Sequence, residues 1–320
     1  MLSFLKKQWF NLLKILISAG LLIYLLFFKT DLGQLLQILR KAAWGYLALA
    51  ALLMIAGTAL RAVRWQVLLN ALDIHVPLPR LVGLYFVGAF FNIFMPSGLG
   101  GDAVKMVELS RSTGKVPEAI GTTLVDRAVG LWVLFVMALV ALPFSYQFLP
   151  PQSVPEILVI ILAGVLGGWL AMGTPLIPWL GDKIRLPGQE KLTRFYRSIS
   201  QLGYAALGKA CLVSLVFNLM LILFNILIAY GLGVYLPVGI FLLFVPIISF
   251  SLALPISIGG LGVREQAYVL LFGTLGISSA TSVALGLTNW LITNLIVGLL
   301  GGIWYSLEGA RELASRKGQV

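Results

Sequence analysis

The sequence predicts an all-α polytopic membrane protein with about six full spans and two re-entrant helical hairpins arranged as an inverted repeat. Three observations support this: the composition, six long apolar runs, and two shorter apolar runs that end in similar proline–glycine motifs. Of 320 residues, 59% are hydrophobic and 11% are charged, and the mean hydropathy is +0.98. Soluble domains are about 25% charged, so a soluble enzyme, a disordered chain and a disulfide-stapled secreted domain are excluded.

The six long runs match the length that a bilayer core of about 30 Å requires. They cover residues 9–28, 44–60, 119–142, 157–180, 211–232 and 279–307. The first run follows Lys6 and Lys7, as the core of a signal peptide would. It is longer than a typical signal core and lacks a small-residue cleavage site, so we interpret it as a span.

Two further runs, 81–95 and 238–254, are short, and each ends at a proline and a glycine pair. If both crossed the membrane, eight spans would place the basic loop 183–209 outside, against the positive-inside rule. If both are re-entrant, both termini are cytoplasmic, and Lys29, Arg40 and Lys41 are the basic residues left outside. The charge distribution therefore favours re-entrance.

We predict a single membrane domain over residues 1–320, organised around the two hairpins. Its parts are a first half (9–142) with hairpin 81–112, a connecting region (143–210), a second half (211–307) with hairpin 238–276, and a cytoplasmic tail (308–320). Two amphipathic stretches, 31–41 and 190–208, are predicted to lie in the membrane interface.

The ends of the two short runs resemble each other. Residues 96–105 read PSGLGGDAVK and residues 255–264 read PISIGGLGVR, so both contain a proline, a glycine pair and a final basic residue. The predicted turn residues are Pro96, Gly98, Gly100 and Gly101 in the first hairpin and Pro255, Gly259, Gly260 and Gly262 in the second. On the six-span topology the hairpins enter from opposite sides, and broken helices of such inverted repeats form substrate sites near the midplane. Close helix packing alone also explains glycines in spans, and the sequence leaves that alternative open.

A charged pair lies deep within a predicted span. Asp126 and Arg127 follow Pro117 by about 14 Å of helix, which places them near the bilayer centre. Charges there are costly and need partners or a wet cavity. Adjacent residues point about 100° apart, so the two do not simply neutralise each other. An ion pair between Arg127 and Asp102 and a role in substrate binding both fit.

The predicted head-group site consists of charged residues close to the two turns. They are Asp102, Lys105, Asp126, Arg127, Arg264 and Glu265. Asn289 and Asn294 are expected either to line the same cavity or to join helices. Arg61 and Arg64, at the end of the second span, are expected to extend to lipid phosphates.

The sequence contains no nucleotide-binding motif, catalytic triad or metal-ligand spacing, so we expect no cofactor, no metal and no enzymatic activity. The formal net charge of +11 fits cytoplasmic loops that face anionic lipids, so nucleic acid is not an expected partner.

Residues 96–105, 125–131 (VDRAVGL) and 259–265 (GGLGVRE) resemble, in this order, the flippase-like membrane domain of lysylphosphatidylglycerol synthases and their stand-alone relatives. The resemblance covers nearly the whole chain. It implies a bacterial inner-membrane or archaeal plasma-membrane protein that moves a phospholipid or lipid-linked head group between leaflets, with anionic phospholipids as its partners. The soluble aminoacyl-transferase domain of the synthases has no counterpart in this sequence, so lysyl transfer is not implied. Many relatives place an arginine after an aromatic residue in the last span, where this chain has Asn289 and Trp290.

Two other functions stay open at this point. Asp126 would suit a proton- or ion-coupled transporter of a small solute, because a buried carboxylate can bind and release a proton. The chain would also suit a non-catalytic membrane partner of a separate lipid- or glycan-modifying transferase. The sequence does not define the lipid, the direction of movement, the energy source or the oligomeric state.

Overall fold

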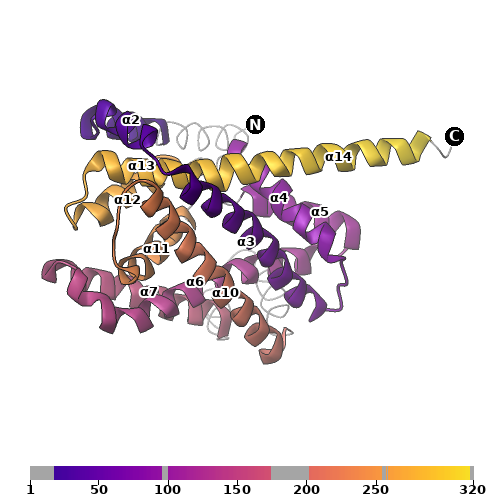
Figure 1. Ribbon diagram of the computed structural model, residues 1–320. Coiled ribbons are helices and arrows are strands. Elements are labelled where there is room, and N and C mark those ends of the chain that lie inside the picture. Colours follow the sequence, from indigo (N-terminus) through magenta and orange to yellow (C-terminus); the bar gives the residue numbers. More distant parts are fainter. Residues whose placement is uncertain (1–17, 96–99, 174–201, 254–256, 258, 318–320) are drawn as a thin grey trace, which may run out of the picture.

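The computed structural model describes residues 18–95, 100–173, 202–253, 257 and 259–317, and every regular element in this part of the chain is a helix (Figure 1). The predicted all-α fold class is therefore confirmed. Three predicted turn residues, Pro96, Gly98 and Pro255, lie outside the described residues, as does most of the predicted interfacial stretch 190–208.

Within the described residues, five helical stretches are long and apolar enough to cross a bilayer, and a bent helix pair is a sixth candidate. The five are α3 (Trp44–Asn70), α6 (Val116–Ser145), α7 (Val154–Gly173), α10 (Gly203–Gly231), and the stretch of α13 (Ser279–Trp290), η4 (Leu291–Ile296) and α14 (Val297–Lys317). The bent pair joins Ser18–Lys29 to α2 (Leu32–Arg40) at 95°. The five long stretches overlap five of the six predicted spans, and Ser18–Lys29 overlaps the described end of the first predicted span, 9–28.

Helix α2 is the first of the two predicted amphipathic stretches. The carboxylate of Asp31 accepts hydrogen bonds from the backbone N–H groups of Gly33 and Gln34, at 2.8 and 3.1 Å, and so caps the helix. Leu35 is buried, whereas the next residue, Leu36, is exposed. One face of the helix is therefore packed against the protein.

The two short apolar runs form helical hairpins. The first hairpin consists of α4 (Leu78–Phe94) and α5 (Gly100–Thr113), and the second of α11 (Val238–Ala253) and α12 (Val263–Gly273). Helices α4 and α11 have 17 and 16 residues, or about 25 Å at 1.5 Å per residue, which is short of an upright span. In each hairpin the second helix packs back against the first.

The glycines of the two turns act differently. A Cβ on Gly101 would lie 2.2 Å from the carbonyl oxygen of Gly88, so the two backbones of the first hairpin approach too closely for any side chain. In the second turn, Gly259, Gly260 and Gly262 have φ values of 56°, 80° and 81°. That left-handed backbone favours glycine. Gly101 therefore needs to be glycine for space, and Gly259, where a Cβ would meet its nearest atom only at 3.4 Å, for conformation; Gly260 and Gly262 combine both reasons, since a Cβ there would lie 2.7 and 2.9 Å from its nearest neighbour.

Helices α3 and α10, the spans that precede the two hairpins, pack against each other in opposite directions. The N–H of Ala43, before α3, donates to the carbonyl of Gly231, at the end of α10, at 2.8 Å. Further along, a Cβ on Gly57 would lie 3.3 Å from the ring of Phe217. These equivalent spans of the two halves are therefore antiparallel, as an inverted repeat requires.

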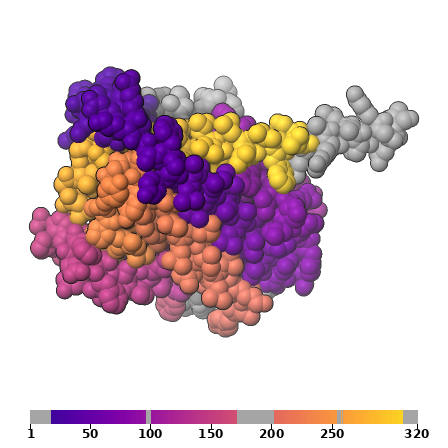
Figure 2. All heavy atoms as spheres, viewed as in Figure 1, coloured from indigo at the N-terminus to yellow at the C-terminus, as the bar shows by residue number. Residues whose placement is uncertain are grey.

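Each hairpin packs on the last span of the other half. Gly83 of α4 lies against Trp304, and Gly301 of α14 lies against Phe86, so α4 and α14 are antiparallel neighbours. In the same way Gly239 of α11 lies against Ser145 of α6. In Figure 2 the indigo residues of α2 and α3 lie beside the orange and yellow residues of the second half. The tips of the two hairpins come together, since a Cβ on Gly259 of the second turn would lie 3.4 Å from the carbonyl oxygen of Asn92 in α4.

Several predicted boundaries differ from the structure. Helix α3 continues to Asn70 rather than ending near residue 60, so Arg61 and Arg64 lie within it. Residues 203–208 belong to α10 rather than to an interfacial helix, and the predicted tail begins as part of α14. The last span contains the π-helical segment η4. The boundary of α3 was missed because the sequence alone does not reveal that Arg64 has a buried partner.

Candidate functional site

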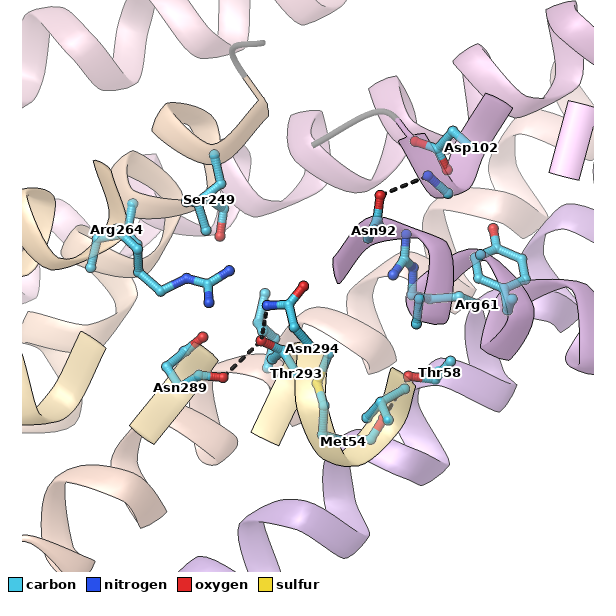
Figure 3. Close-up of a pocket in the computed structure, with 18 of the residues that line it drawn as sticks. Met54, Thr58, Arg61, Asn92, Asp102, Ser249, Arg264, Asn289, Thr293 and Asn294 are labelled. Carbon is cyan, nitrogen blue, oxygen red and sulfur yellow. Dashed lines mark hydrogen bonds between the residues drawn. The ribbon is translucent and has the colours of Figure 1, made fainter. Parts of the chain in front are cut away.

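A polar cavity of about 200 Å³ lies where the two hairpins meet. Liquid water occupies about 30 Å³ per molecule, so the space suits a small polar group. Five polar or charged residues from the first half and six from the second line it: Thr58, Arg61, Asn92, Asp102 and Lys105, and Asn225, Ser249, Arg264, Asn289, Thr293 and Asn294. Figure 3 shows Arg264 and Arg61 on opposite sides of this space, with Asn294 between them.

Asp102 of the first hairpin is neutralised by two cations. Its Oδ1 lies 2.8 Å from Lys105 Nζ, and its Oδ2 accepts a hydrogen bond of 2.6 Å from Arg127 Nη1. The predicted pairing of Arg127 with Asp102 is therefore confirmed. Because Arg127 lies on α6, this ion pair also fastens the first hairpin to the neighbouring span. Arg127 itself is not among the residues that line the cavity.

Asp126 forms a second buried charge pair, one layer behind the cavity wall. Its Oδ1 accepts a hydrogen bond of 2.6 Å from Arg64 Nε, and its Oδ2 accepts one from the hydroxyl of Tyr85. Arg64 is 2% exposed and also donates to Ser214 Oγ at 3.0 Å. The expectation that Arg64 extends to lipid phosphates is therefore wrong. A buried cation is retained at this position because Asp126, 62 residues away in the sequence, supplies its partner.

Aromatic rings hold the cations of the first half in place. Lys105 Nζ lies 3.8 Å from the centroid of the Tyr85 ring, and Arg61 Cζ lies 5.0 Å from the same ring. Arg61 also lies 5.6 Å from the ring of Phe217 on α10. Such cation–π contacts are worth about 2 kcal/mol when desolvated. Tyr85 therefore connects Asp126 to both cations that face the cavity from this half.

Arg264 of the second hairpin differs from these residues, because it is buried and two of its three guanidinium nitrogens have no hydrogen-bond partner among the described residues, although the charge of the adjacent Glu265 acts on it. Its side chain lines the cavity and the residue is 6% exposed. Neither Nε nor Nη1 forms a hydrogen bond with the part of the protein that the structure describes. The indole Nε1 of Trp290, near Gly259 in the second turn, also lacks an acceptor. Leaving buried donors unsatisfied costs about 1–3 kcal/mol each, more for charged groups, so this arrangement fits an anionic ligand.

Glu265 has a structural contact rather than a place in the cavity wall. Its Oε2 accepts a hydrogen bond of 2.6 Å from the N–H of Gly262, which caps the first turn of α12. On its other side, a Cβ on Gly286 of α13 would lie 3.0 Å from Glu265 Cα. The side chain is buried and does not line the cavity.

The second half has a network of neutral groups near the cavity. Asn225 Oδ1 accepts from the hydroxyl of Tyr268 at 2.5 Å and from Asn289 Nδ2 at 3.1 Å. Asn289 Nδ2 also lies 3.2 Å from the hydroxyl of Tyr268. The sequence predicts that Asn289 and Asn294 either line the cavity or join helices. Both line the cavity, so the first of these two expectations is confirmed.

The predicted site residues thus fall into two groups. Three of the six charged residues line the cavity: Asp102, Lys105 and Arg264. The turn residue Gly101 lines it as well. The other three charged residues do not line it: Asp126, Arg127 and Glu265. Sequence reasoning missed six of the eleven polar lining residues named above: Thr58, Arg61, Asn92, Asn225, Ser249 and Thr293. Asn92 had a local signal: it precedes the first turn, and its Oδ1 accepts the N–H of Gly101 at 2.6 Å. Within the described residues, no group of three His, Cys, Asp or Glu side chains could hold a metal ion.

Comparisons with known proteins agree with this arrangement. Residues 11–301 match the family described as the lysylphosphatidylglycerol synthase TM region. The chain is 24% identical to the UPF0104 membrane protein PH1989 of Pyrococcus horikoshii, over 91% of this chain and 95% of the relative. It is also 24% identical to a UPF0104 membrane protein of Methanothermobacter thermautotrophicus, over 91% of this chain and 92% of the relative. The match covers most of the residues that form the spans and both hairpins, and this integral membrane protein therefore belongs to the lysylphosphatidylglycerol synthase transmembrane-region family.

Proposed function

We propose that this protein moves a phospholipid, or a lipid-linked group with an anionic head group, between the leaflets of its membrane. One observation carries the proposal: Arg264 is buried at the junction of the two hairpins, lines the cavity and has two guanidinium nitrogens without acceptors in the part of the chain that the structure describes. Phosphate oxygens would supply acceptors for these nitrogens, because charge-assisted hydrogen bonds from guanidinium to phosphate are among the strong ones.

The inverted repeat supports movement as well as binding. In transporters of this architecture, two repeats rock against each other around a fixed site near the midplane. Here the site would be the cavity between the hairpins, while the acyl chains stay in the bilayer. Both termini would lie in the cytoplasm, since this orientation leaves few basic residues outside. The membrane would be a bacterial inner membrane or an archaeal plasma membrane.

A proton-coupled mechanism through Asp126 has less support. Asp126 does not line the cavity, and both of its carboxylate oxygens are bonded, to Arg64 and Tyr85. A solute in the cavity would therefore not contact this carboxylate directly.

The proposal is tested by leaflet exchange in reconstituted liposomes. Purified protein is incorporated into vesicles that contain fluorescent phosphatidylglycerol, and a membrane-impermeant quencher reports how fast the inner-leaflet lipid reaches the outside. We expect exchange faster than in empty vesicles, and a fall of roughly tenfold or more for Arg264→Gln, because hydrogen bonds to charged groups contribute about 1.5–3 kcal/mol.

Arg111→Gln is the matched control. Arg111 lies on α5, its side chain is 74% exposed, and it pairs with Glu108 away from the cavity. This variant should exchange lipid at the wild-type rate. Thermal melting of each variant in detergent verifies that it is folded. Exchange no faster than in empty vesicles, or an Arg264→Gln variant as active as Arg111→Gln, would overturn the proposal.

A further inference from the structure

The cavity wall has more basic than acidic residues, and its basic residues differ in whether they already form an ion pair. Arg61, Lys105 and Arg264 are the basic residues of its wall, and Asp102 is the acidic one among the described residues. The sequence has no charged residue at positions 96–99, 254–256 and 258, which complete the two turns. The wall therefore carries an excess of positive charge.

The one acidic group of the wall is already neutralised. Each carboxylate oxygen of Asp102 has its own cation, Lys105 at 2.8 Å and Arg127 at 2.6 Å. An ammonium group brought into the cavity would have to displace one of these cations and would meet the like charge of Arg61 and Arg264. Of the other buried acids among the described residues, Asp126 is paired with Arg64. Glu265 has one carboxylate oxygen, Oε1, without a hydrogen-bond partner, but it does not line the cavity and its charge acts on the neighbouring Arg264.

The donors in the wall favour the opposite kind of group. Arg264 presents Nε and Nη1 without acceptors. The amide nitrogen of Asn289, by contrast, already donates to Asn225 and Tyr268. Phosphate oxygens can therefore bind two guanidinium nitrogens of Arg264, while an amine in the cavity would meet neutral oxygens and the Asp102 carboxylate, which is already paired. Uncompensated like charges brought together in a buried site are strongly unfavourable.

We infer that the cavity selects head groups that combine a phosphate with a neutral polar group and rejects head groups that carry an amine. This inference rests on the proposed function for the site itself, and it names the substrate class. Phosphatidylglycerol belongs to the accepted class. Phosphatidylethanolamine and the lysyl ester of phosphatidylglycerol belong to the rejected class, even though the synthases that give the family its name are named for that ester.

The test is competition for binding to the intact chain in detergent. Fluorescent phosphatidylglycerol is bound first, and unlabelled lipids with identical acyl chains then displace it. We expect phosphatidylglycerol to displace the probe at a concentration at least tenfold lower than phosphatidylethanolamine or the lysyl ester. Glycerol 3-phosphate is added as a soluble competitor. Displacement by it supports phosphate recognition with a free ester as the source, and displacement by the lipid alone supports the lipid as the source.

A carboxylate added to the wall should change the preference. Ser249 of α11 lines the cavity on the same side as Arg264 (Figure 3). Ser249→Asp should weaken phosphatidylglycerol binding about tenfold and narrow the gap to the aminated lipids, whereas Ser249→Asn, similar in size and uncharged, should keep the wild-type order. Equal displacement by all the lipids, or an unchanged order in Ser249→Asp, would overturn the inference.

The two proposals fail in distinguishable ways. Selective binding without leaflet exchange would refute the transport function and leave the selectivity standing. Equal exchange of phosphatidylglycerol and the aminated lipids would refute the selectivity and leave transport standing.

Discussion

The two hairpins carry a basic residue at the same position but treat it differently. Lys105 and Arg264 each follow the turn proline by nine residues, and both side chains line the cavity. Three residues earlier the first hairpin has Asp102, which pairs with Lys105, whereas the second has Leu261. One cation is therefore held in an ion pair, and the other is available to a ligand.

The spans that complete the two halves show the same contrast. Helix α6 contributes Asp126 and Arg127, both in ion pairs, while α13 contributes Asn289 to a neutral hydrogen-bond network. The comparison teaches that similar helix arrangements in the two halves are joined by different forces. Ion pairs join the helices of the first half, whereas in the second half Arg264 keeps two nitrogens without acceptors among the described residues.

The largest expected effect comes from breaking the charge pair of the first half. Arg64→Leu leaves Asp126 buried without its cation and should lower the free energy of unfolding by about 3–5 kcal/mol. Asn289→Leu in the second half removes neutral hydrogen bonds, each worth about 1 kcal/mol, and should cost less. Thermal melting in detergent measures both.

The double variant Arg64→Leu with Asp126→Leu provides the control for this first prediction. It removes both charges and should recover most of the lost stability, because replacing a whole buried pair by apolar groups is often neutral. If the Arg64→Leu and Arg111→Leu variants had the same melting temperature, the Arg64–Asp126 ion pair would not stabilise the first half, and the comparison of the two halves would be wrong.

A smaller effect is expected at the turns. Gly101→Ala places a methyl group against the Gly88 carbonyl and should destabilise the first hairpin by about 1–3 kcal/mol or more. Gly259→Ala meets its nearest atom only at 3.4 Å but must adopt a left-handed backbone. Its cost should be about 1–2 kcal/mol.

The melting temperatures of the two glycine variants are compared with that of a control variant. Gly208→Ala in α10, where a Cβ meets nothing within 4 Å, should be neutral or stabilising. A Gly259→Ala variant less stable than Gly101→Ala would contradict the distinction between a turn that needs space and a turn that needs conformation.

The smallest expected effect comes from a substitution that removes the acidic residue of the first hairpin, so that its basic residue, like that of the second, has no acidic residue three positions earlier. Asp102→Asn removes the charge that neutralises Lys105 and Arg127, so binding of labelled phosphatidylglycerol should tighten several-fold, with a stronger dependence on salt. Glu108→Gln, which removes an exposed carboxylate of the same helix, should leave binding unchanged. Weaker binding in Asp102→Asn would show that Asp102 itself contacts the ligand.

Much of this protein could be predicted from the sequence because the relevant physics is local. Apolar length defines the spans, and the left-handed backbone that glycine allows fits the turn at Gly259. The spacing of proline, glycine and cation also reveals the repeat, since each feature lies within one continuous segment.

The ion pairs depended on the tertiary structure. Arg64 belongs with Asp126 because α3 and α6 meet, and Arg127 belongs with Asp102 because α6 packs on α5. Sequence reasoning listed six charged residues as one site, and only three of them line the cavity. A side chain's partner is set by which helices are neighbours, and a buried charge in a bilayer is costly unless such a neighbour supplies a partner, as α6 does for Arg64 and as no described helix does for two nitrogens of Arg264.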